Sequence, residues 1–90
     1  MPYRVRVTDA ARRELLRLPG HVRQRARRAV EELANQPRPS GARELRDRPG
    51  RFRFWLDGWR VIYRVDDEAQ TVLVLTVRRK TGPETYADIE

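Results

Sequence analysis

The sequence contains no cysteine, a single histidine and a single lysine. Without cysteine there can be no disulfide, no thiolate zinc site and no thiol nucleophile. His21 stands at a predicted helix-helix turn, and the sequence has no acid-histidine cluster with metal-ligand spacing. No glycine-rich phosphate loop is present either. We therefore expect no metal and no cofactor, and we assign His21 a capping or surface role.

The sequence also lacks a long apolar run. No stretch approaches the roughly 18 residues that a membrane-spanning helix needs. The N-terminal segment MPYRVRVTDA alternates polar and apolar residues and has no continuous apolar core of the signal-peptide type. These features predict a cytoplasmic protein with no membrane partner. The length of 90 residues predicts a single domain over residues 1–90, with residues 81–90 as a C-terminal tail.

The net charge of +7 is carried by arginine and is unevenly distributed. Residues 1–60 contain sixteen arginines and seven acids, whereas residues 61–90 contain four basic residues and six acids. Such an excess favours a polyanionic partner, either nucleic acid or an acidic protein segment, and it predicts salt-sensitive binding. The alternative is that the composition reflects coding bias and solubility.

The apolar pattern predicts a strand, two helices and three further strands. Residues 3–7 alternate strictly, as a half-buried strand does. Thr8 is the predicted N-cap of the first helix, which should end just before Pro19 because proline disfavours helical geometry in the preceding residue. A second amphipathic helix spans about residues 21–35. Two prolines and a glycine then break the chain over residues 35–41, before the three strands.

The predicted fold class is α+β, with the order β-α-α-β-β-β and a helical hairpin on one face of a mainly antiparallel four-stranded sheet. Asp57-Gly58 lies between two alternating runs and predicts a two-residue hairpin turn of type I′. In that register Leu56 faces Trp59, and Arg51 faces Arg64. One face of the hairpin is then apolar and comprises Phe52, Phe54, Leu56, Trp59, Val61, Tyr63 and Val65. The other face carries Arg51, Arg53, Trp55, Arg60, Ile62 and Arg64.

Two helices can cover only the apolar face, so the second face should remain a basic surface. The facing pair Arg51 and Arg64 is destabilising unless an anion lies between them, and the planar guanidinium suits phosphate. Trp55 is a candidate platform for base stacking. The alternatives are a solvated arginine face and a Trp55 that packs on Ile62 or under a loop.

The element order, the hairpin RFRFWLDGWRVIYRV and a basic cluster followed by Tyr86 resemble the RelE/ParE superfamily of toxins from bacterial and archaeal toxin-antitoxin pairs. The resemblance covers nearly the whole chain and implies a RelE-like fold. RelE-type members are ribosome-dependent endoribonucleases that cut mRNA. ParE-type members poison DNA gyrase and lack most of the RelE catalytic side chains.

The resemblance also implies site residues. The positions that match the family's catalytic pattern are Arg51, Arg53, Arg60, Lys80 and Tyr86. Candidates for nucleic-acid contacts around them are Trp55, Arg64, Arg78 and Arg79. If the alignment shifts by one residue, Arg79 takes the place of Lys80. The chain departs from the best-known RelE pattern because arginine replaces lysine at 51 and 53, and lysine replaces arginine at 80.

Metal-independent RNA cleavage uses the neighbouring 2′-hydroxyl as nucleophile and needs a base, an acid and cations near the phosphate. Arginine does not deprotonate usefully in proteins, so it can supply only the cations. We therefore expect Lys80 to act as general acid, and Tyr86 to act as base or as a positioning and stacking group. The alternatives are an exposed Lys80 in a solvated tail and a Tyr86 that anchors the C-terminus.

Three functions remain open from the sequence. The first is a ribosome-dependent mRNA endonuclease whose partners are the ribosome, mRNA and a cognate antitoxin. That antitoxin would lay an acidic segment over the basic surface and set the oligomeric state. The second is a ParE-like gyrase inhibitor without nuclease activity, and the third is a non-catalytic RNA-binding relative. The three arginines and the Lys80–Tyr86 pair favour cleavage.

Overall fold

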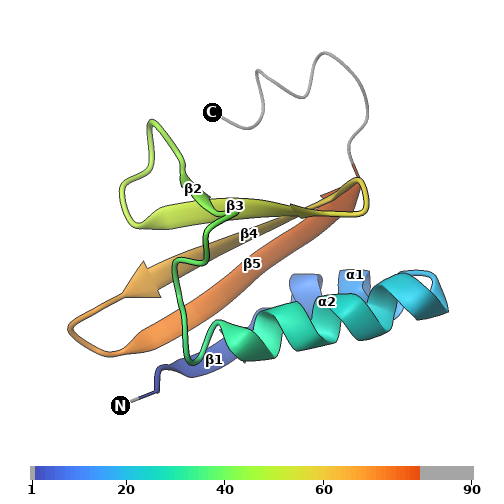
Figure 1. Cartoon of the computed structure of the whole chain (residues 1–90), viewed down its shortest axis with the longest axis horizontal. Coiled ribbons are helices and arrows are strands. Elements are labelled where there is room, and N and C mark those ends of the chain that lie inside the picture. Colours follow the sequence, from blue (N-terminus) through green and yellow to red (C-terminus); the bar gives the residue numbers. More distant parts are fainter. Residues whose placement is uncertain (1, 80–90) are drawn as a thin grey trace.

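The computed structural model describes residues 2–79. These residues form seven elements: β1 (Arg4–Val7), α1 (Asp9–Leu16), α2 (Gly20–Glu32), β2 (Arg43–Glu44), β3 (Arg51–Leu56), β4 (Trp59–Asp66) and β5 (Thr71–Arg79). The strands form one sheet in the order β1-β5-β4-β3-β2, in which β1 and β5 are parallel and the other neighbours are antiparallel. Figure 1 shows α1 and α2 on the same side of this sheet. The predicted α+β arrangement is confirmed.

The described part of the sheet has five strands instead of the four expected. The additional strand, β2, contains only two residues and pairs Arg43 with Arg53 and Glu44 with Phe52. A strand of two residues is too short to produce an alternating pattern, so periodicity could not indicate it. The helices are also shorter than predicted, because α1 ends at Leu16 and α2 at Glu32.

The core lies between the helices and the apolar face of the sheet. Thr8 caps α1 as predicted, since its Oγ1 accepts a hydrogen bond of 3.0 Å from the Ala11 N–H. Helical spacing turns Val22, Ala26 and Val30 of α2 toward the sheet. The buried sheet residues that belong to the same cluster are Phe52, Phe54, Val61, Tyr63, Val65, Val72, Val74 and Val77.

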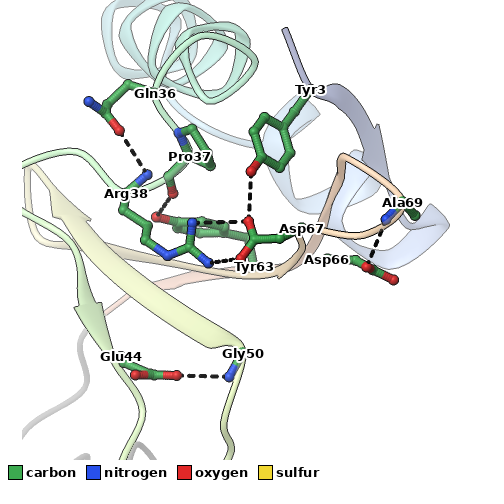
Figure 2. Close-up of polar contacts among 10 residues, drawn as sticks. All are labelled: Tyr3, Gln36, Pro37, Arg38, Glu44, Gly50, Tyr63, Asp66, Asp67 and Ala69. Atoms are coloured by element: carbon green, nitrogen blue, oxygen red, sulfur yellow. Dashed lines mark hydrogen bonds and ion pairs between the residues drawn. The ribbon is translucent and has the colours of Figure 1, made fainter. Parts of the chain in front are cut away.

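A polar network fixes the connection from α2 to β2 against the sheet (Figure 2). Arg38 binds Asp67 in the β4–β5 turn with two hydrogen bonds, Nη1 to Oδ1 at 3.2 Å and Nη2 to Oδ2 at 2.8 Å. The Tyr3 hydroxyl donates to Asp67 Oδ1 at 2.6 Å, and the buried Tyr63 hydroxyl donates to the Pro37 carbonyl at 2.8 Å. Asp67, in the β4–β5 turn, is thus hydrogen-bonded both to Tyr3 before β1 and to Arg38 in the connection from α2 to β2.

The electrostatics of this network predict a pH-dependent contribution to stability. Hydrogen bonds from Arg38 and Tyr3 lower the pKa of Asp67, and burial raises the pKa of Tyr63 to about 12. The pKa of Asp67 is lower in the folded protein than in the unfolded chain, where a carboxyl group has a pKa of about 3.9. Ionised Asp67 therefore stabilises the fold fully above the unfolded pKa, and this stabilisation is lost as the pH falls through the folded pKa.

We expect Asp67→Asn to lower the free energy of unfolding at pH 7, with the difference from wild type shrinking as the solution is acidified below about pH 4. Urea unfolding between pH 7 and pH 2.5 measures this difference. Asp47→Asn, at an exposed position between β2 and β3, is the matched control. A deficit for Asp67→Asn that stays constant with pH would contradict the assignment.

Candidate nucleic-acid interface

The sheet face that turns away from the helices carries cross-strand pairs of arginine. The predicted hairpin register is confirmed, with Leu56 facing Trp59 and Arg51 facing Arg64. Within residues 2–79, two further pairs occur, Arg43 with Arg53 and Arg60 with Arg78. Residues that face each other in an antiparallel pair lie on the same side of the sheet. We call this surface the basic face and define it by Arg43, Arg51, Arg53, Trp55, Arg60, Ile62, Arg64 and Arg78.

Arg43 extends the basic face beyond the predicted hairpin. It lies on β2 and is exposed, and its partner Arg53 is half-buried. Arg43 was not among the predicted site residues because the two-residue strand that carries it was not predicted. Within the described chain, neither Arg51 nor Arg64 forms an ion pair with an acid.

Trp55 lies beside the arginines of β3 and is 38% exposed. Since Arg53 and Trp55 are two residues apart on one strand, they share a face, and the Arg53 Cζ atom is 5.9 Å from the centre of the Trp55 ring. This distance suits a cation–π contact. The exposed indole therefore remains a candidate for stacking on a base.

The register places Arg60 on the basic face as predicted, but the residue is buried, with only 9% exposure. The expectation of an open surface at this position is therefore wrong. Arg60 lies on a central strand between Trp55 of β3 and Arg78 of β5, so large side chains flank it on both sides. Arginine is not deprotonated in proteins, so the buried guanidinium keeps its positive charge.

The two arginines that end β5 turn to opposite sides of the sheet. Arg78 faces Arg60 and approaches an acid, with 3.6 Å between its Nε and Glu14 Oε2. Arg79 faces Trp59, and its Cζ lies 5.8 Å from the Trp59 ring. Trp59 packs against the core, so the structure does not bring Arg79 together with the basic face.

Lys80 and Tyr86, the predicted proton-transfer residues, lie outside the described residues. His21 is exposed in the first turn of α2, the helix that packs on the apolar face of the sheet and not on the basic face. Residues 2–79 hold no group of three or more His, Cys, Asp or Glu side chains that could bind a metal ion. Over the same residues, no helix combines the length and apolar character needed to cross a bilayer.

Comparison with known proteins shows the family. Residues 5–81 match the family described as the ParE toxin of type II toxin-antitoxin systems. Toxin RelG of Mycobacterium tuberculosis is 37% identical over 78 residues, which cover 86% of this chain and 90% of that protein. The chain belongs to the ParE toxin family, within the RelE/ParE superfamily.

Solved structures of this superfamily share the fold. The RelBE2 toxin-antitoxin complex of M. tuberculosis contains a chain that is 34% identical, with a TM-score of 0.75 and coverage of 89% of this chain and 100% of that chain. The isolated RelE toxin of E. coli is 27% identical, with a TM-score of 0.78 and coverage of 96% and 93%. The predicted RelE-like fold is therefore confirmed, and the protein is a toxin of a type II toxin-antitoxin system.

Because Arg51 and Arg64 face each other on neighbouring strands, we expect charge repulsion within the basic face to destabilise the free toxin. We expect Arg64→Gln to raise the free energy of unfolding by about 0.5 kcal/mol at low ionic strength, because it removes repulsion from Arg51. The gain should shrink in 0.5 M salt, which screens exposed charges. Denaturant unfolding at two salt concentrations measures it. Arg28→Gln, on the exposed side of α2, is the control, and an equal gain there would refute the pairwise repulsion.

Proposed function

We propose that this toxin is a ribosome-dependent endoribonuclease that cleaves mRNA without a metal ion. The observation that supports this proposal is the basic face, where pairs of arginine on neighbouring strands surround an exposed indole. Arginine forks suit the phosphate backbone, and a tryptophan suits an unpaired base. RelE-type toxins, which this chain resembles, use such cations for RNA cleavage.

The chemistry assigns different tasks to the arginines and to the C-terminal residues. In our proposal Arg51, Arg53 and Arg60 stabilise the negative charge that grows on the phosphate as the 2′-hydroxyl attacks, which leaves a 2′,3′-cyclic phosphate and a 5′-hydroxyl. Arg43, Arg64 and Arg78 bind the flanking backbone. Lys80 protonates the leaving 5′-oxygen, and Tyr86 acts as base or orients the substrate.

Cleavage of a defined mRNA on programmed ribosomes tests this function. We expect Lys80→Ala and Tyr86→Phe to lower the single-turnover rate about 100-fold, as loss of acid-base catalysis does. Arg64→Ala should weaken substrate binding, with a smaller effect on the rate at saturation. Arg28→Ala is the charge-matched control and should cleave at the wild-type rate. A wild-type protein that leaves mRNA intact and blocks supercoiling by DNA gyrase would identify the ParE-like alternative, which the matched family makes the second candidate.

A second surface, on the helix side of the molecule, suits the antitoxin partner that the family implies. A groove of about 360 Å³ lies between β1, α1 and α2. Its apolar residues are Val5, Val7, Leu15, Leu16 and Val30, and its charged residues are Arg12, Arg23, Arg27 and Glu31. Leu16 lines this groove and is 64% exposed, so its apolar side chain is accessible to a partner.

Within residues 2–79, β1 beside this groove is an edge strand, with β5 as its strand neighbour on one side and none on the other. The N–H groups of Arg4 and Thr8 bond to the carbonyls of Gln70 and Val74 at 2.9 and 3.0 Å, so Val5 and Val7 present their main-chain groups to the other edge of β1. Three arginines against one glutamate favour an acidic occupant. We propose that an acidic, amphipathic segment of the cognate antitoxin binds this groove and edge.

We expect Leu16→Glu to weaken antitoxin binding about 10-fold or more, since it places a charge among apolar contacts and acidic groups. Isothermal titration of the toxin with its antitoxin measures the change. Arg28→Glu, on α2 but outside the groove, is the control for the added acid. Unchanged affinity of Leu16→Glu would place the antitoxin elsewhere, for example over the basic face.

A further inference from the structure

Strand β5 contains one residue that has no partner on the neighbouring strand β4. This residue determines to which side of the sheet the arginines at the end of β5 point. Along β4 and β5, Tyr63 faces Val74, whereas the preceding residue Ile62 faces Thr76. Leu75 is therefore the extra residue of a β-bulge. Such a bulge exchanges the two faces of the strand beyond it.

The bulge is what adds Arg78 to the basic face. If the register before the bulge continued, Arg60 would face Val77, and Trp59 would face Arg78. With the bulge, Arg60 faces Arg78 instead, and Val77 turns into the core with 2% exposure. The same step sends Arg79 to the side of Trp59.

Beyond Val74, the edge of β5 that β1 covers has no strand partner within residues 2–79, because β1 pairs with β5 only as far as Val74. Main-chain groups on this edge therefore need other hydrogen-bond partners. Two side chains of the α1 segment replace the missing strand. Thr8 Oγ1 donates to the Leu75 carbonyl at 3.0 Å. Glu14 Oε1 accepts from the Val77 N–H at 2.7 Å and from Thr76 Oγ1 at 3.0 Å.

The second oxygen of the same carboxylate reaches the basic face. Glu14 Oε2 lies 3.6 Å from Arg78 Nε, which also donates to Thr76 Oγ1 at 3.3 Å. The Glu14 side chain is 23% exposed, whereas that of Arg78 is 68% exposed. One half-buried carboxylate therefore holds the bulge and orients the arginine that the bulge turns outward.

We propose that Glu14 is a positioning residue of the nucleic-acid interface. It fixes the bulge in β5, and it thereby aligns Arg78 with Arg60 for contact with the RNA backbone. This inference rests on the proposed nuclease function for its effect on activity. Its structural part, the control of register by Glu14, stands apart from that function.

The first measurement addresses the register. In Glu14→Ala, we expect the Val77 amide to exchange with solvent at least about 10-fold faster, because it loses its acceptor, and the contact between the Arg60 and Arg78 backbones to disappear from NMR spectra. Glu14→Gln keeps an oxygen acceptor and should keep both signals. Should Glu14→Ala not fold, Thr76→Val removes the hydroxyl that contacts both Glu14 and Arg78, and it is expected to accelerate Val77 exchange more weakly. Glu68→Ala, an exposed acid in the β4–β5 turn, is the control.

The second measurement addresses function through a double-mutant cycle on mRNA cleavage. We expect Glu14→Ala and Arg78→Ala each to lower cleavage about 10-fold, and the double variant to be no slower than Arg78→Ala, because Glu14 acts through Arg78. Glu14→Gln should cleave within about threefold of wild type. If Glu14→Ala lowers the cleavage rate by the same factor in wild type and in Arg78→Ala, Glu14 does not act through Arg78 and the positioning role is wrong. An unchanged rate of Val77 amide exchange in Glu14→Ala would also overturn it. A wild type that does not cleave refutes the proposed function, and the NMR result then still decides whether Glu14 sets the register.

Discussion

The two-residue turn between β3 and β4 is the constraint on which the rest of the molecule depends. Asp57 and Gly58 adopt positive φ angles of 50° and 81°, as a type I′ turn requires. Asp57 also forms an ion pair with Arg25, so that α2 holds the tip of the hairpin. A register shift of one residue would turn Phe52 and Phe54 to solvent and bury their arginine neighbours. The turn thus decides at once which residues form the core and which form the basic face.

The basic face and the core place opposite demands on the same strands. The core face has apolar residues in contact, such as Phe52 and Tyr63 with ring centres 5.8 Å apart, and it stabilises the sheet. On the other face, arginine lies opposite arginine on three pairs of neighbouring strands within the described chain, which opposes that stability. A bound polyanion would remove this repulsion. Binding of a polyanion to the basic face would therefore stabilise the folded protein.

The sequence was sufficient for the hairpin, the core face and the family, because turn chemistry, alternation and family motifs all indicated the same register. It was insufficient where a feature depends on contacts between distant segments. The two-residue β2 and its Arg43 left no periodic signal. The bulge at Leu75 depends on Glu14, which lies on another element, and so the division of Arg78 and Arg79 between two faces could not be predicted. The burial of Arg60 follows from its neighbours on two strands, which no single stretch of sequence reveals.

In the function that we propose, the basic face positions the mRNA backbone for attack by its own 2′-hydroxyl. The most direct measurement uses ribosomes programmed with two mRNAs that differ only by a 2′-deoxy nucleotide at the cleavage site. We expect wild-type toxin to cut the all-ribose mRNA, to leave a 2′,3′-cyclic phosphate on the product, and to leave the deoxy-substituted position intact. Cleavage of both mRNAs at the same position and rate would show that the 2′-hydroxyl is not the nucleophile.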